Sequence, residues 1–255
     1  MIGAIAGDII GSVYEHNGIQ TKDFPLFHPE CRFTDDTVLT VAIADAILSG
    51  QTYLHAVRRH SKRYPNAGYG ASFYRWIHSP DSRPYNSWGN GSAMRVSPVG
   101  FAFSSEDEVL RQARLTAEIT HNHPEGIKGA EATALSVFLA RTKRDKALIR
   151  TRIVRLFGYD LNRTLDSIRP TYSFDVSCQG TVPEAIVAFL ESESYEDAIR
   201  NAISLGGDSD TLACITGGIA EAFYGGVPAA ITGTVEQILA SDLWEITEQF
   251  RAEHL

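Results

Sequence analysis

The sequence predicts an all-α fold, a single domain over residues 1–255 built as an orthogonal bundle of many helices. Helix start and stop signals recur from end to end, whereas alternating strand patterns with hairpin turns are scarce. Glycines at four-residue spacing indicate helices that approach neighbouring backbones closely. No linker favours two domains, and the length is sufficient to bury a sizeable core.

The first predicted helix lies in GAIAGDIIGSVYE (3–15), where glycine recurs at every fourth position. On one helix, Asp8, Ser12 and Glu15 would share a face, because they lie four and three residues apart. An exposed polar stripe or a frayed helix end explains this pattern equally well. Beside a metal cluster, Glu15 becomes a candidate acid or base.

The later predicted helices are marked by apolar periodicity and by proline or glycine punctuation. The first of them covers 36–49 and stops at Gly50, and the second covers 129–142. Residues 141–155 are expected to present a basic, solvated helix face. Three more helices are expected at 182–193, with Pro183 in the first turn, at 194–206, ending at Gly206, and at 234–252, which is amphipathic. Residues 60–100 are rich in Gly, Pro, Ser and Asn, which predicts irregular structure.

The composition is that of a soluble globular protein, with 44% hydrophobic and 21% charged residues. The net charge of −8 disfavours nucleic acid, except as a modified substrate, and anionic membranes as partners. The N-terminal segment lacks a basic region and is too short to span a bilayer. Three widely spaced cysteines form no CxxC pair, and we therefore expect a reduced, cytoplasmic protein and a monomer.

Two acidic helix entrances dominate the sequence, RFTDDT from Arg32 and LGGDSDT from Leu205. Either one alone is explained by helix capping. If the two entrances meet, however, four carboxylates repel one another unless they are protonated, separated or bound to a cation. Hard oxygen donors of this kind suit Mg²⁺, Mn²⁺ or Ca²⁺. The four carboxylates belong to Asp35, Asp36, Asp208 and Asp210.

Three further stretches have the composition of ligand-binding loops. NSWGNGSAMRVSPVG (86–100) can cradle phosphate through backbone N–H groups, although a plain loop would look the same. THNHPEG (120–126) holds His121 and His123, whose expected role is to orient a substrate or cap a helix rather than to bind zinc. SCQGTVPEA (177–185) is a polar helix entrance that could meet an anion.

Together these motifs resemble the ADP-ribosylglycohydrolase family. The resemblance rests on GAIAGDIIGSVYE, FTDDT, GNGSAMR, THNHPEG and GGDSDT, which follow in the family's order over nearly the whole chain. The pairing of FTDDT with GGDSDT is its most specific part.

The resemblance implies an all-helical domain with two Mg²⁺ or Mn²⁺ ions and a set of site residues. The implied metal ligands are Thr34, Asp35, Asp36, Asp208, Asp210 and Thr211. The implied catalytic residues are Glu15, Asp35, Asp36 and Asp210. The implied substrate-binding residues are Gly89, Asn90, Gly91, Ser92, Met94, Arg95, His121, Ser177 and Gly180.

The implied reaction is hydrolysis at C1″ of ADP-ribose attached to a protein side chain, with an arginine N-linkage favoured and a serine O-linkage next. The implied partners are an ADP-ribosylated protein and ADP-ribose. The alternatives are a noncatalytic ADP-ribose-binding or crystallin-like structural member, a binuclear-metal hydrolase of another ADP-ribose derivative, and a phosphoesterase.

Overall fold

The all-α prediction is confirmed by the computed structural model, which describes residues 1–255 and contains helices but no sheet. The β-type pairing is an isolated antiparallel bridge between Gly89 and Ser177. In chain order the helices are α1 (Ile2–Gly11), α2 (Asp35–Ser49), α3 (Tyr53–Arg63), α4 (Ala71–His78), α5 (Gly91–Met94), α6 (Ser97–Ala102), α7 (Glu106–Glu118), α8 (Pro124–Lys143), α9 (Lys146–Phe157), α10 (Leu165–Ile168), α11 (Cys178–Leu190), α12 (Tyr195–Ile203), α13 (Ser209–Tyr224), α14 (Ala229–Ile238) and α15 (Ser241–His254).

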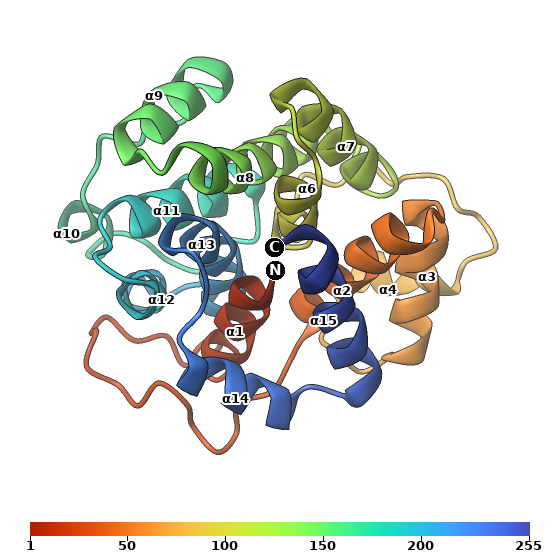
Figure 1. Ribbon diagram of the computed structural model, residues 1–255, viewed down its shortest axis with the longest axis horizontal. Helices are drawn as coiled ribbons and strands as arrows, with labels where there is room; N and C mark the ends of the chain where they lie inside the picture. The colour runs from red at the N-terminus through yellow and green to blue at the C-terminus, as the bar shows by residue number, and fades with distance from the viewer.

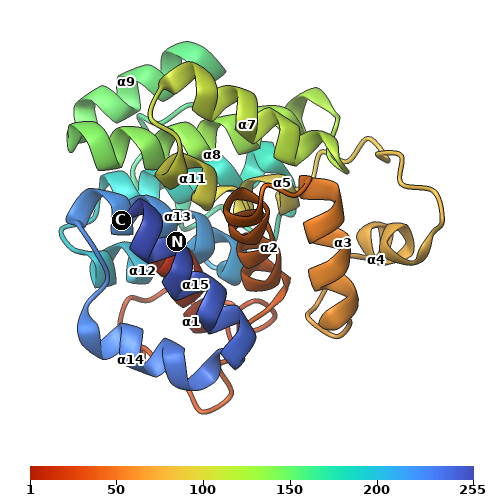
Figure 2. The ribbon, with the colours of Figure 1, turned by 45° about the vertical axis from the view of Figure 1, so that its right-hand side comes forward.

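Helices α1 and α13 pack side by side in the interior of the bundle, and the other helices surround them (Figures 1 and 2). A methyl group added at Gly7 would lie 2.0 Å from the carbonyl oxygen of Ala213. One added at Gly217 would lie 2.1 Å from the carbonyl oxygen of Gly3. The expected close backbone approach is therefore present, and it brings the ends of α1 and α13 together.

Helix α2 agrees with its prediction to within one residue. Thr34 caps its start by accepting a hydrogen bond of 3.3 Å from the Asp36 backbone N–H. Gly50 ends it in the left-handed conformation, with φ of 68°. Local capping chemistry was sufficient to predict both ends.

Other helix boundaries differ from the predictions. Helix α8 begins at Pro124 rather than at 129. The basic segment 141–155 is divided between α8 and α9 by Arg144, which is left-handed. The amphipathic segment 234–252 is divided between α14 and α15, because Leu239 and Ala240 are extended.

Pro183 lies inside α11 and not in its first turn. The helix starts earlier because Ser177 accepts a hydrogen bond of 3.0 Å from the Gly180 backbone N–H. The Ser177 capping signal thus outweighed the usual preference of proline for a first turn.

Residues 60–100 are less irregular than expected, because they include α4 and α5 and the beginning of α6. Helix α4 buries Phe73, Trp76 and Ile77, whose spacing places them on one face. The helix was not predicted because its apolar stripe is short and the surrounding glycines and serines are typical of irregular structure.

The prediction that Glu15 shares a helix face with Asp8 and Ser12 is wrong. Helix α1 ends at Gly11, and the Tyr14 backbone N–H donates to the Gly11 carbonyl in a turn. Glu15 therefore belongs to the connection between α1 and α2.

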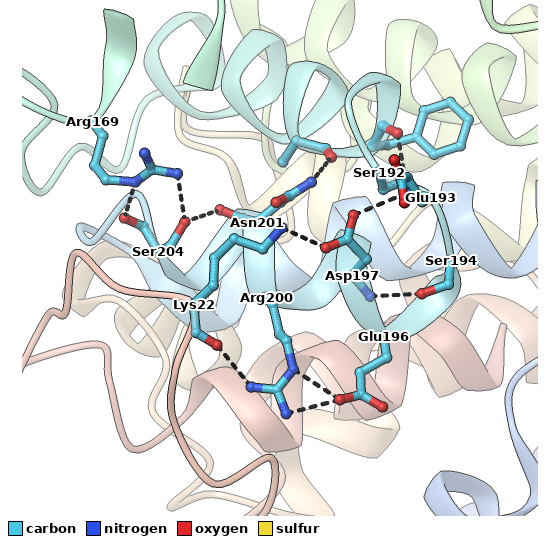
Figure 3. A network of polar contacts seen from close by, with 12 residues as sticks. Lys22, Arg169, Ser192, Glu193, Ser194, Glu196, Asp197, Arg200, Asn201 and Ser204 are labelled. Atoms are coloured by element: carbon cyan, nitrogen blue, oxygen red, sulfur yellow. Dashed lines mark hydrogen bonds and ion pairs between the residues drawn. The ribbon is translucent and has the colours of Figure 1, made fainter. Parts of the chain in front are cut away.

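This connection, residues 12–34, contacts α12 through hydrogen bonds and an ion pair (Figure 3). Arg200 donates hydrogen bonds of 2.9 and 2.8 Å to the carbonyl oxygens of Lys22 and Phe24. The Lys22 ammonium pairs with Asp197. These contacts hold the connection that carries Glu15 against the rest of the bundle.

None of the helices combines the length and the apolar character that crossing a membrane requires.

Candidate metal and substrate site

The two acidic helix entrances meet where α2 and α13 begin. The Thr211 hydroxyl donates a hydrogen bond of 3.4 Å to Oδ2 of Asp36, so the second motif contacts the first directly. Asp36 and Asp210 are both buried. The expectation that the entrances crowd their carboxylates together agrees with this geometry.

Two carboxylate triads share Asp210. Ligand atoms of Asp8, Asp36 and Asp210 lie within 4.8 Å of one another, and so do those of Glu15, Asp208 and Asp210. Asp210 is therefore common to the two groups of acidic side chains that could hold a metal ion. Asp35 belongs to neither triad, although it lines the same cavity.

Asp8 holds the first motif in place from α1. Its Oδ2 accepts hydrogen bonds from the backbone N–H groups of Thr34 and Thr37, at 2.9 and 3.1 Å, and one from the Thr37 hydroxyl. Its Oδ1 accepts one of 2.6 Å from the Thr34 hydroxyl. The Thr34 side chain thus turns toward Asp8 and is not among the residues that line the cavity.

The sequence reasoning did not include Asp8 in the metal set. A usable signal was present, since Asp8 interrupts an otherwise small and apolar helix. A charged residue in such a helix requires a buried partner.

Burial raises the pKa of the clustered carboxyl groups, and mutual repulsion raises it further for several of them. Burial raises the pKa of Asp8 to about 6, despite its hydrogen bonds from Thr34 and Thr37. Burial, together with the charge of Asp8, raises the pKa of Asp35 to about 8. The pKa values of Asp36, Asp208, Asp210 and Glu15 are raised for the same primary reason.

The donor set fits a hard divalent cation. Oδ1 of Asp36 is buried and has no hydrogen-bond partner, which is costly for a carboxylate unless a ligand meets it. The two groups of side chains that could hold an ion consist of carboxylates, and the Thr211 hydroxyl lies beside them. Such a set suits Mg²⁺ or Mn²⁺ better than a thiophilic metal.

A cavity of about 380 Å³ opens above the carboxylates. Its lining includes most of the predicted site residues: Glu15, Asp35, Asp36, Gly89, Asn90, Gly91, Met94, Arg95, His121, Asp208, Asp210 and Thr211. The glycine loop is joined to the acidic cluster by Asn90, whose Nδ2 donates to Oδ2 of Asp208 at 2.7 Å. The carboxylates of the two acidic motifs and the guanidinium group of Arg95 therefore line one cavity.

Arg95 supplies a buried positive charge to this cavity. One of its nitrogens, Nη2, donates to the Thr116 carbonyl at 2.7 Å and to the Thr120 hydroxyl at 2.9 Å. Its Nε and Nη1 are buried without partners. Burial and the charge of Arg95 lower the pKa of His121 well below its usual value, so that the imidazole stays neutral.

Three of the predicted substrate residues lie behind the cavity lining. Ser92 donates to the Gly126 carbonyl at 2.7 Å, and Ser177 caps α11. Gly180 is covered by Asp175, whose carboxylate would lie 2.0 Å from an added methyl group. These three residues shape the loops that face the cavity.

Sequence reasoning missed part of the lining. The missed residues are Leu39, Gly68, Gly70, Ala71, Ser72, Phe73, Tyr85, Ser87, Phe174 and Val176. Phe174 and Val176 are about half exposed, at 52% and 47%, which is unusual for apolar side chains beside a cavity. They lie in a loop without a local pattern, so only the fold brings them to the site.

Comparisons with known proteins show what the chain is similar to. A family model described as ADP-ribosylglycohydrolase matches residues 1–254. The chain is 28% identical to the ADP-ribosylhydrolase ARH3 of Mus musculus over an alignment of 308 positions, which covers 88% of this chain and 82% of that protein. It is 25% identical to the ADP-ribosylarginine hydrolase Tri1 of Pseudomonas putida strain GB-1 over an alignment of 264 positions, which covers 88% of this chain and 69% of that protein.

Among solved structures, a chain of an ADP-ribosylglycohydrolase-related protein complex superposes with a TM-score of 0.73. The superposition covers 100% of this chain and 96% of that one, at 23% sequence identity. At this identity the likeness establishes a shared fold.

Proposed function

Because the chain belongs to the ADP-ribosylglycohydrolase family, we propose that it hydrolyses the bond between C1″ of ADP-ribose and a protein side chain. The family resemblance drawn from the sequence motifs is confirmed by the match over residues 1–254. The observation that carries the proposal is the position of Asp210 in two carboxylate triads beneath a cavity that also holds Arg95.

The residues that would hold two Mg²⁺ or Mn²⁺ ions are those of the two acidic motifs, Thr34, Asp35, Asp36, Asp208, Asp210 and Thr211. Asp8, which forms a triad with Asp36 and Asp210, would share in holding an ion and also fixes the first motif through its contact with Thr34. When bound, the ions would supply positive charge that orients and polarises the hydroxyl groups of the ribose. Hydrogen bonds that orient metal-binding side chains, such as the one between Thr34 and Asp8, strongly affect metal affinity in proteins.

In the proposed reaction the bond from C1″ to the side chain breaks while a water oxygen bonds to C1″. The water loses one proton and the leaving side chain gains one, which balances the hydrolysis. Glu15 lies in a triad with Asp208 and Asp210 and also lines the cavity, so it is the candidate for moving these protons. The surrounding carboxylates favour the positive charge that develops on the sugar.

The diphosphate would lie along the glycine loop. Arg95 has two buried guanidinium nitrogens without partners, and a guanidinium is well suited to pair with phosphate oxygens. His121 stands beside the loop, with its Nε2 3.1 Å from the position that a methyl group at Gly91 would occupy. A larger residue at Gly91 would therefore meet the imidazole.

We favour an arginine N-linkage, with a serine O-linkage as the next choice. A cationic guanidinium is complementary to a rim that includes Glu15, which remains partly exposed. The name of the Pseudomonas putida relative points to the same linkage in that protein.

The test is release of free ADP-ribose, measured by mass spectrometry, from matched peptides modified on arginine or on serine. Each peptide is incubated with Mg²⁺, Mn²⁺ or a chelator, with Asp210→Asn as the paired variant. We expect metal-dependent release from the arginine peptide, and none with Asp210→Asn. Binding of ADP-ribose without release from either peptide would contradict the proposal and favour a noncatalytic binding protein.

A further inference from the structure

Helix α8 ends in an unusual way. Four helices of this protein end on a left-handed residue, and in α2, α9 and α13 that residue is glycine: Gly50, Gly158 and Gly225. In α8 it is Arg144, with φ of 51° and ψ of 41°. A side chain in this conformation costs free energy that glycine avoids. A residue that bears such a cost without an evident structural need is a candidate for function.

The side chain of Arg144 lies over the end of α13. Its Nη2 is 3.1 Å from the position that a methyl group at Gly225 would occupy. Gly225 is itself left-handed, with φ of 81°, and it leaves the room that the guanidinium occupies. The two helix ends are therefore complementary in shape.

Arg144 is one of three arginines that line a second cavity, of about 470 Å³. The other two are Arg141 at the end of α8 and Arg251 at the end of α15, which lies beside α2 (Figure 1). This cavity shares no lining residue with the acidic site. In a protein of net charge −8, such a local excess of positive charge is not a general property of the surface.

These cations are poorly compensated. No carboxylate lies within 4.0 Å of the Arg141 or Arg144 guanidinium, whereas Arg251 pairs with Glu248 at 2.5 Å. Arg141 donates instead to the Phe103 carbonyl at 2.8 Å. The acidic side chain of the lining, Glu221, is buried, pairs with the Met1 amino group and accepts a hydrogen bond of 2.8 Å from the Gly3 backbone N–H. The last residue of the chain, Leu255, also lines the cavity.

We propose that this cavity binds a small phosphate-bearing anion, held by the guanidinium groups of Arg141 and Arg144. Guanidinium groups pair with phosphate oxygens through parallel N–H donors. The concave shape and the volume favour a small anion over an extended polyanion. This site is independent of the hydrolase activity proposed above.

The chemistry fits either inorganic phosphate or the diphosphate of a nucleotide, so the experiment uses both. The wild-type protein is titrated calorimetrically with inorganic phosphate and, separately, with ADP. The same titrations are made on Arg144→Gly and on the matched control Lys143→Ala, which removes a neighbouring positive charge outside the cavity lining. Thermal unfolding of each variant reports folding.

Glycine fits the left-handed conformation, so Arg144→Gly should be at least as stable as the wild type. We expect it to weaken anion binding about tenfold or more, while Lys143→Ala leaves the affinity unchanged. If Arg144→Gly weakens the binding of phosphate and of ADP alike, phosphate is the recognised group. If the wild type binds ADP more tightly than phosphate and Arg144→Gly removes that difference, the ligand is a nucleoside diphosphate. Absence of binding to the wild type, or equal loss in the two variants, would overturn the proposal.

Discussion

Asn90 donates a hydrogen bond of 2.7 Å from its Nδ2 to Oδ2 of Asp208, across a sequence separation of 118 residues. The same nitrogen donates to the Thr181 hydroxyl at 3.1 Å. The glycine loop, the start of α11 and the second acidic motif are thereby joined at one side chain. Asn90 was expected to contact substrate, and the structure adds that it orients a proposed metal ligand.

This contact predicts that Asn90→Ala lowers the affinity for Mn²⁺ about 10- to 100-fold, the usual effect of removing a group that orients a metal ligand. Calorimetric titration of Mn²⁺ measures the effect, and the exposed Asn162→Ala is the control. Unchanged Mn²⁺ affinity in a folded Asn90→Ala protein would show that Asp208 needs no such support.

Arg95→Lys should weaken ADP-ribose binding about tenfold or more, because lysine keeps the charge but loses the planar fork of donors. The prediction depends on the two buried guanidinium nitrogens without partners. Titration with ADP-ribose checks it against the exposed Arg155→Lys. Equal affinities in the two variants would place the diphosphate away from Arg95.

The metal-free protein should lose stability as pH rises toward 8. The pKa of Asp35 is about 8 in the folded chain, against about 3.9 in an unfolded chain. The folded state therefore binds more protons than the unfolded state between these values, and stability falls as pH rises through this window. The decline should be clearest above about pH 6.5, because His60 and His121, whose pKa values are lowered in the folded chain, are then largely neutral in both states and no longer oppose it.

Urea unfolding in the presence of a chelator measures this decline. Asp35→Asn should flatten it, because the variant carries no titrating carboxyl group at this position. Added Mg²⁺ or Mn²⁺ should restore stability at pH 8. Stability that rises over this interval in metal-free wild type would contradict the account of the carboxylate cluster.

Gly7→Ala should destabilise the protein by about 3 kcal/mol or more, or prevent folding, because overpacking at a rigid contact is costly. The added methyl group would meet the Ala213 carbonyl of α13 at 2.0 Å. Gly233→Ala is the matched control, since nothing lies within 4 Å of its added methyl group in α14.

The control should be neutral or stabilising by up to about 1 kcal/mol, as glycine is a weak helix former. Urea unfolding compares the two variants. Similar stabilities would mean that the α1 and α13 contact tolerates an adjustment that the static geometry excludes.

Features with local chemical causes were predictable from sequence. The Thr34 cap and the Gly50 stop of α2 depend on neighbouring residues, and the likeness of the two acidic motifs suggested that they meet. Glu15 was placed on the wrong element because no residue near Gly11 strongly signals a helix end. Pro183 was placed in a first helical turn because proline is tolerated there, but the Ser177 cap starts α11 earlier and leaves Pro183 inside the helix.

The rest of the site depends on tertiary contacts. Asp8 serves the first acidic motif through bonds to Thr34 and Thr37, 26 and 29 residues away. Phe174 and Val176 reach the cavity from a loop without periodicity. No local pattern encodes such distances, although an acid within a small, apolar helix identifies Asp8 as a residue that needs partners.

The central claim is that two acidic helix entrances, far apart in sequence, form one metal centre. The most direct measurement is the stoichiometry and affinity of Mn²⁺ binding by calorimetry in the wild type and in Asp210→Asn, with thermal unfolding to confirm that both are folded. We predict two Mn²⁺ ions per wild-type chain, and loss of binding in Asp210→Asn, because Asp210 belongs to both triads. A wild type that binds no Mn²⁺, or an Asp210→Asn protein that binds it equally well, would contradict the claim.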